Sequence, residues 1–276
     1  MPGLMEGKRG LIMGVANDHS IAWGISQALA HHGAKLAFTY QGEALAKRVK
    51  PLAQSVGSEF LMPCDVEDVA SVDSVFAEIK KQWGTLDFLV HAIGFSDKNE
   101  LRGRFAETTR ENFVRTMVIS CFSFTECAKR AAALMPNGGS MLTLTYNGGD
   151  RAMPNYNTMG LAKAALEASV RYLAVDYGQQ RIRVNAISAG PIRTLAGAGI
   201  TDARYMFAFQ QKYSPLGRGV TLEELGGAGL YLLSDLSTGV TGEIHFVDSG
   251  YNVIAMPHPD SLKEESEAKA RPKAAE

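Results

Sequence analysis

Short apolar runs alternate with longer amphipathic stretches along most of the chain. The runs predict buried strands over residues 8–13, 35–40, 59–63, 86–92, 140–145, 183–188 and 243–247. The run at 86–92 is almost continuously apolar, as parallel strands are when helices cover both of their faces. Helical spacing between the runs predicts helices over about 69–83, 109–134 and 221–233, with two more opening near 20 and 156. This alternation predicts an α/β fold, a single doubly wound parallel sheet of the Rossmann type.

Two stretches depart from this regular pattern. Residues 194–213 are first rich in glycine and then crowded with aromatic side chains. This indicates a hinged helical lid whose apolar inner face suits an acyl chain. The alternative is a helix packed permanently on the body or on another subunit. Pro, Lys, Glu and Ala dominate residues 260–276, as in a disordered tail, so we expect one domain over residues 1–259.

Composition excludes several classes of protein. The 276 residues carry a formal net charge of −1, so nothing favours binding to nucleic acid or to an anionic membrane. No apolar run is long enough to span a bilayer and the amino terminus lacks the apolar core of a signal peptide, which predicts a cytoplasmic protein. Cys64, Cys121 and Cys127 form no CxxC pair, so we expect packing residues and no metal site.

The first predicted strand runs into a glycine turn that opens a helix, an arrangement that binds anions through unpaired helical N–H groups. Gly14 would form the tight turn, and Ser20 and Ile21 would offer N–H groups at the helix mouth. Gly24 would let the helix lie close to the sheet. Six residues replace the middle of the usual G-x-G-x-x-G pattern, so a plain strand-to-helix turn stays an alternative.

Further candidate residues follow the next three strands. Gln41 stands where a dinucleotide fold usually holds the adenosine ribose with an acidic residue, and no Arg or Lys comes directly after it, which favours NADH over NADPH. Asp65 could accept from the adenine amino group or could cap a helix. Gly94 would let a flat ring approach the backbone, and Ser96 would lie at the rim of a substrate pocket. His91, inside the strand pattern, is expected to be a satisfied core histidine.

The strongest chemical candidates are Tyr146, Tyr156 and Lys163. Tyr146 ends the fifth strand, where ligands of open parallel sheets bind. Tyr156 and Lys163, seven residues apart, lie nearly in register on one helix face, with the phenol at the helix mouth. A phenol there can donate to a substrate oxygen, and a nearby cation can hold cofactor hydroxyls and favour negative charge. An isolated pair at this spacing is more often a surface Tyr and a solvated Lys.

These motifs resemble the short-chain dehydrogenase/reductase superfamily and, within it, the bacterial NADH-dependent enoyl-acyl-carrier-protein reductases of fatty-acid synthesis. The resemblance spans about residues 7–256. It rests on Gly14 to Gly24, Tyr40-Gln41, Cys64-Asp65-Val66, Ile93-Gly94-Phe95, Tyr156 to Lys163 and Asn185 to Thr194. Ketone-reducing members carry Tyr-x3-Lys, whereas here Gly160 stands at that lysine position and the spacing is Tyr-x6-Lys.

The resemblance implies NADH as cofactor, an enoyl chain on acyl-carrier protein as substrate, and a homotetramer. It implies that Tyr156 stabilises an enolate, that Lys163 holds the nicotinamide ribose hydroxyls, and that Tyr146 is a second active-site phenol. The implied cofactor contacts are Gly14, Ser20, Ile21, Gln41, Asp65, Val66, Ile93, Lys163, Ile192, Arg193, Thr194, Leu195 and Ala196. The expected substrate contacts are Ser96, Tyr156, Met206 and Phe207.

Two rival functions remain at this stage. One is a ketone or alcohol dehydrogenase of the same superfamily, against which the absence of Tyr-x3-Lys argues. The other is a non-catalytic dinucleotide-binding regulator, because a fold does not imply a function. Ser96, which replaces a frequent alanine, and Ala203, where an aromatic residue is usual, leave the acyl-length preference open.

Overall fold

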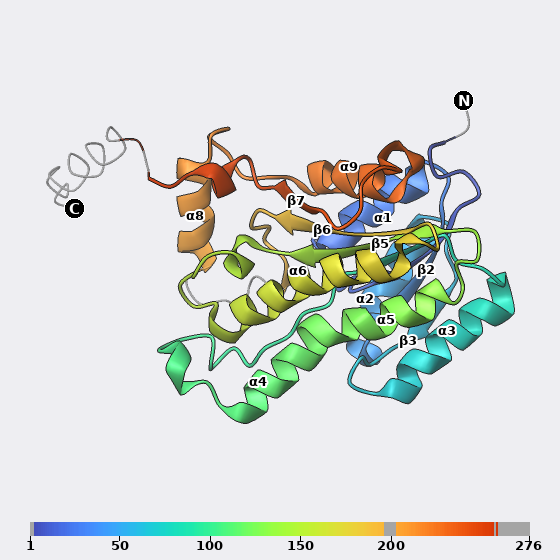
Figure 1. The fold of residues 1–276 in the computed structure, drawn as a ribbon, viewed down its shortest axis with the longest axis horizontal. Coiled ribbons are helices and arrows are strands. Elements are labelled where there is room, and N and C mark those ends of the chain that lie inside the picture. The colour runs from blue at the N-terminus through green and yellow to red at the C-terminus, as the bar shows by residue number, and fades with distance from the viewer. Residues whose placement is uncertain (1–2, 196–202, 257, 259–276) are drawn as a thin grey trace, which may run out of the picture.

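The computed structural model describes residues 3–195, 203–256 and 258. Its centre is a parallel sheet of seven strands in the order β3-β2-β1-β4-β5-β6-β7 (Figure 1). The strands are β1 (Arg9–Met13), β2 (Lys35–Tyr40), β3 (Leu61–Pro63), β4 (Phe88–His91), β5 (Gly139–Thr145), β6 (Ile182–Ala189) and β7 (Ile244–Val247). The chain builds outward from β1 to β3 and then restarts at β4 on the other side of β1. The predicted Rossmann sheet is confirmed, and its order reverses between β1 and β4, where such folds bind ligands.

Helices cover both faces of this sheet (Figure 1). One buried apolar cluster joins the sheet to α1 (Ile21–His31), α2 (Gly42–Ser55) and α9 (Leu222–Leu233). The opposite cluster joins it to α3 (Val69–Trp83), α5 (Ser123–Ala132) and α6 (Asn157–Gly178). The strands between them are mostly buried on both faces, which explains the apolar runs in the sequence.

The helix expected over 109–134 is interrupted. It consists of α4 (Arg110–Met117), a π-helical segment η2 (Val118–Phe122) and α5. Within η2, the Ser120 hydroxyl accepts from the Phe95 N–H at 2.8 Å and donates to the Phe95 carbonyl at 2.9 Å. The segment thereby fixes the loop after β4. A pattern of apolar residues that is read with the α-helical period alone does not show where a single wider turn lies.

The position of Gly24 also differs from the expectation. A Cβ built on Gly24 would lie 2.6 Å from the Leu222 carbonyl oxygen, and one on Gly226 would lie 2.6 Å from the Gly24 carbonyl oxygen. Gly24 therefore lets α1 approach α9, not the sheet. The two helices are about 200 residues apart in sequence, and nothing in the local pattern pairs them.

The other helical elements are four segments of three residues each and one longer helix. They are η1 (Phe105–Glu107), η3 (Asn147–Gly149), η4 (Asp235–Ser237), η5 (Tyr251–Val253) and the helix α8 (Ala203–Tyr213), which stands beyond one end of the sheet (Figure 1). All three cysteines are buried, as expected of packing residues. No helix in the described residues is both long and apolar enough to cross a membrane, and no group of three possible metal ligands was found there. The tail expected at 260–276 lies outside the described residues.

Candidate active site

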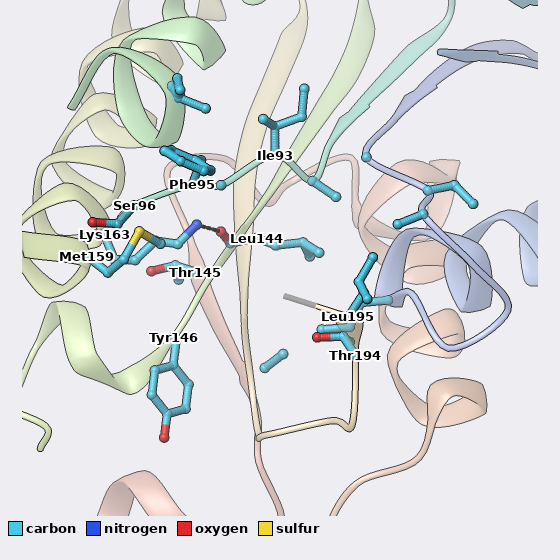
Figure 2. Close-up of a pocket in the computed structure, with 18 of the residues that line it drawn as sticks. Ile93, Phe95, Ser96, Leu144, Thr145, Tyr146, Met159, Lys163, Thr194 and Leu195 are labelled. Atoms are coloured by element: carbon cyan, nitrogen blue, oxygen red, sulfur yellow. Dashed lines mark hydrogen bonds between the residues drawn. The ribbon is translucent and has the colours of Figure 1, made fainter. Parts of the chain in front are cut away.

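A cavity of about 670 Å³ opens at the carboxyl ends of the strands. Its walls come from the segments that follow β1 to β6, and from α6 and α8. The volume is in the range of a ligand pocket. Figure 2 shows Lys163 and Tyr146 at one wall and Thr194 and Leu195 across from them.

Most of the expected site residues line this one cavity. They are Gly14, Ile21, Gln41, Asp65, Val66, Ile93, Ser96, Tyr146, Tyr156, Lys163, Ile192, Thr194, Leu195, Met206 and Phe207. Ser20 and Arg193 are not among the lining residues. Ala196 lies outside the described residues.

The turn after β1 is formed as expected at Gly14 and differently at Ser20. Gly14 has a φ of +100°, and a Cβ there would lie 2.1 Å from the Ala92 carbonyl oxygen. The Ser20 N–H, however, donates to the Asn17 carbonyl at 3.1 Å, so the expectation that it is available to an anion is wrong. The Ser20 hydroxyl oxygen accepts from the N–H groups of Ala16 and Asn17 at 3.0 and 3.1 Å. Ser20 therefore stabilises the turn through hydrogen bonds within it, while Ile21 lines the cavity.

Two polar side chains mark the cavity wall beyond β2 and β3. Gln41 stands at the N-cap of α2 but makes no capping hydrogen bond with its side chain. The N-cap of α3 is Asp68, which accepts from the Ala70 N–H at 3.0 Å, so the capping alternative for Asp65 is wrong. Asp65 accepts from the Glu67 N–H at 3.0 Å and keeps its place at the wall. Both side chains can thus take a polar ligand.

The two phenols lie against each other. Tyr156 is the N-cap residue of α6, at the helix mouth as predicted, and its ring meets that of Tyr146 edge to face with centroids 5.2 Å apart. Tyr156 is 5% exposed, so a surface tyrosine is excluded. Burial is the main reason that the pKa of each phenol is raised above its ordinary value. Both hydroxyls are therefore protonated at neutral pH and can donate a hydrogen bond.

Lys163 lies two turns into α6 and is 8% exposed. Its Nζ donates to the Leu144 carbonyl oxygen at 2.8 Å, which is the dashed contact in Figure 2. Burial lowers the pKa of Lys163 to about 8. The amine is thus still charged at neutral pH, at the wall of the cavity, and the solvated-lysine alternative is wrong.

Beyond β4, the cavity wall is a polar network. The Ser96 hydroxyl donates to Asn112 Oδ1 at 3.3 Å and accepts from Thr116 Oγ1 at 2.9 Å.

His91 is fully buried, as expected of a core histidine, and its Nε2 lies 2.9 Å from Ser123 Oγ. Its Nδ1 has no hydrogen-bond partner among the described residues, so only one of its two ring nitrogens is satisfied there. Burial, then the nearby Lys163 charge, lowers the pKa of His91 to about 3, which makes it neutral.

Sequence reasoning missed two partners of these side chains. Glu167 accepts from the Thr145 hydroxyl at 2.6 Å, one residue before Tyr146. Its position four residues after Lys163 on α6 places both on one helix face, and that spacing could have pointed to it. Gln210 donates from Nε2 to the Tyr146 hydroxyl oxygen at 3.1 Å, a contact from α8 that local sequence gives no means to find.

The helix α8 covers part of the cavity. Met206, 7% exposed, and Phe207 line the cavity from this helix. Phe209 meets the rings of Tyr213 and Tyr251 at centroid distances of 4.5 and 6.3 Å. The apolar inner face expected of residues 194–213 is thus present on α8, while hinged motion stays a prediction and residues 196–202 lie outside the described part.

Comparisons with known proteins agree on one family. A family model described as Enoyl-(Acyl carrier protein) reductase matches residues 14–252. A relative from Rhizobium meliloti, Enoyl-[acyl-carrier-protein] reductase [NADH] 2, is 73% identical over 95% of this chain and 98% of its own. The crystal structure of FabI from Candidatus Liberibacter asiaticus superposes with a TM-score of 0.91 at 62% identity, covering 94% of this chain and 100% of that one. The enoyl-(acyl-carrier-protein) reductase of Anaplasma phagocytophilum, solved in complex with NAD, gives 0.90 at 56% identity over 94% and 98%.

Proposed function

This chain belongs to the family of bacterial NADH-dependent enoyl-acyl-carrier-protein reductases of fatty-acid synthesis, and we propose that it works through an enolate stabilised by Tyr156. The observation that carries the proposal is the pairing of a buried, protonated Tyr156 with a buried Lys163 at the wall of one cavity. A non-catalytic regulator, the rival function, would not need a buried phenol and a buried amine at one cavity.

The residues around the cavity fit NADH. Gly14 and Ile21 line the cavity at the β1–α1 turn, and a Cβ on Gly94 would lie 3.8 Å from the Lys163 Nζ, so a side chain there would narrow the approach to the amine. We propose that Gln41 and Asp65 hold the adenosine end and that Lys163 binds the nicotinamide ribose hydroxyls. Bound NADH supplies the hydride that reaches the β-carbon of the enoyl chain. The segment Ile192–Leu195 would close the site over the nicotinamide.

The role of Tyr156 follows from where charge develops. When the β-carbon of an enoyl thioester gains a hydride, negative charge collects on the thioester oxygen. A phenol that stays protonated in its buried setting can donate a hydrogen bond to that oxygen. The bond is stronger to the charged oxygen than to the neutral carbonyl, and only this difference accelerates the reaction. The Lys163 ammonium favours the same charge.

We propose that the acyl chain lies in the part of the cavity that α8 lines. Met206 and Phe207 offer apolar contacts, whereas Ser96 is already bound to Asn112 and Thr116 and lies at the polar side of the wall. The substrate is an enoyl chain carried by acyl-carrier protein. We further propose the homotetrameric state that the family resemblance implies. The cytoplasmic location stays a prediction.

The first test separates catalysis from cofactor binding. Tyr156→Phe removes the donor but keeps the ring, and we expect kcat for a trans-2-enoyl thioester to fall about 100- to 1000-fold, as for the loss of an oxyanion-hole donor. The affinity for NADH, measured by its fluorescence, should change little. Lys163→Ala should instead weaken NADH binding directly. Small and equal effects of both changes on both quantities would contradict these roles.

A second measurement addresses the ketone-reductase rival. NADH oxidation is followed by absorbance with a trans-2-enoyl thioester and, in parallel, with a β-ketoacyl thioester, each repeated with NADPH. We expect consumption of NADH with the enoyl substrate and formation of the saturated product. Reduction of the β-ketoacyl substrate alone would favour the rival.

A further inference from the structure

Gln210 is a buried glutamine that touches an active-site phenol. Its side chain is 4% exposed, and its Nε2 donates to the Tyr146 hydroxyl oxygen at 3.1 Å. Its Oε1 is buried without a hydrogen-bond partner among the described residues. A buried amide group with an unpartnered oxygen is destabilising, so folding alone does not account for a glutamine here.

The helix that carries Gln210 is held on two sides. Met206, one turn earlier, lines the cavity, and residues four apart lie on the same helix face. The neighbouring Phe209 packs against Tyr251, with ring centroids 6.3 Å apart. The Gln210–Tyr146 contact is thus a hydrogen bond between the cavity-facing side of α8 and the residue that follows β5.

We propose that Gln210 is a positioning residue for enoyl reduction that orients the Tyr146 hydroxyl toward the cavity. Because the Tyr146 oxygen accepts from Gln210, its own proton must point to another acceptor. Tyr146 lines the cavity and lies edge to face with Tyr156, so a reacting oxygen bound there is within reach of both phenols. This inference rests on the proposed function and on the expectation from the family resemblance that Tyr146 is a second active-site phenol.

The Gln210–Tyr146 hydrogen bond also connects α8, which lines the cavity, to a phenol of the active site. Gln210 belongs to α8 and Tyr146 follows β5, so the hydrogen bond exists only while α8 is seated over the cavity. The phenol is then oriented by the same helix whose Met206 and Phe207 line the cavity.

A double-mutant cycle tests the proposal. Gln210→Met keeps the length of the side chain and removes the N–H donor, and Tyr146→Phe removes the hydroxyl. We expect Gln210→Met alone to lower kcat about three- to tenfold, the usual effect of one neutral hydrogen bond, with NADH affinity unchanged. In the Tyr146→Phe background it should cause no further loss, because its partner is already absent.

Two outcomes would overturn the inference. One is an unchanged kcat in Gln210→Met, and the other is an equal loss with and without the Tyr146 hydroxyl. The failure of the proposed function is distinguishable, since Tyr156→Phe would then leave kcat unchanged, whereas an unchanged kcat in Tyr146→Phe would overturn this inference alone.

A second variant tests the direction of the hydrogen bond. A carboxylate accepts but cannot donate, so Gln210→Glu would draw the Tyr146 proton away from the cavity. We expect a larger loss of kcat than in Gln210→Met, about tenfold or more. An equal or smaller loss contradicts the proposed orientation. The exposed neighbour Gln211 gives the matched control, and Gln211→Met should leave kcat unchanged.

Discussion

The contacts between α1 and α9 and those between α6 and β5 lie on opposite faces of the same sheet and are built in opposite ways. Between α1 and α9, Gly24 and Gly226 bring backbone against backbone, and the packing is apolar. Between α6 and β5, the Lys163 amine binds the Leu144 carbonyl and the Thr145 hydroxyl binds the Glu167 carboxylate. The α1–α9 contact is possible because two glycines lack side chains, whereas the α6–β5 contact is made by charged and polar side chains.

The difference separates stability from chemistry. Close apolar packing between helices contributes directly to the free energy of unfolding. A buried ammonium does the reverse, and the lowered pKa of Lys163 records the cost of keeping its charge away from water. The α6–β5 contact therefore holds a charge that the fold alone does not favour, at the cavity that the two phenols also line.

The largest effect expected from the contrast between these two contacts is the pH dependence of catalysis. With the pKa of Lys163 at about 8, the amine loses its charge as the pH rises above that value. We expect kcat/KM for NADH to fall about tenfold per pH unit there, so about 100-fold two units above the pKa. Initial rates with a trans-2-enoyl thioester, corrected for its spontaneous hydrolysis, measure this. A flat profile would contradict a role of the charge.

Stability should follow the opposite trend in the same pH range. Lys163 titrates at about 8 in the folded chain against an ordinary value of 10.5, so between these values the unfolded chain binds more protons. The free energy of unfolding contributed by this group therefore rises with pH, by about 1 kcal/mol per unit. Urea unfolding of the wild type and of Lys163→Met, at fixed protein concentration and several pH values, isolates the contribution of Lys163 to the free energy of unfolding. An identical pH slope in the two proteins would contradict it.

The next prediction concerns a substitution that disrupts the α1–α9 contact. In Gly226→Ala, the new Cβ would lie 2.6 Å from the Gly24 carbonyl oxygen, and a backbone atom cannot rotate away. We expect the free energy of unfolding to fall by about 1–3 kcal/mol, the usual cost of overpacking. The midpoint of urea unfolding at fixed protein concentration measures it, because subunit association would otherwise change the result. A wild-type midpoint would mean that α1 and α9 can separate without cost.

The same contrast explains how far sequence alone could reach. Apolar runs and helical spacing predict each strand and most helices, because burial on both faces leaves a local pattern. Gly24 was assigned to the wrong neighbour, since its partner Leu222 belongs to a helix far along the chain. The π-helical segment is not predicted, because a pattern that is read with one helical period does not locate a single wider turn.

For the site, residues at strand ends were predictable and their partners were not. The topology of a parallel sheet brings the carboxyl ends together, so Gln41, Asp65 and Tyr146 could be expected at one cavity. The hydrogen bond that uses the Ser20 N–H within its own turn depends on loop geometry that spacing does not fix. Gln210 was missed for the reason that applies to Gly24, because its partner is distant in sequence.

The smallest expected effect is also the sharpest control on the α1–α9 contact. Gly227 is adjacent to Gly226 in α9, but a Cβ on it would meet no atom within 4 Å. Replacing a helical glycine by alanine there reduces the conformational freedom of the unfolded chain, so Gly227→Ala should raise the free energy of unfolding by about 0.5–1 kcal/mol. Gly226→Ala has the same gain in helix propensity, so the difference between the two variants reports only the contact with α1. Unfolding of both in urea, at one protein concentration, should move the midpoints in opposite directions. Equal midpoints would show that helix propensity, not the close approach of the two helices, determines which residues α9 tolerates.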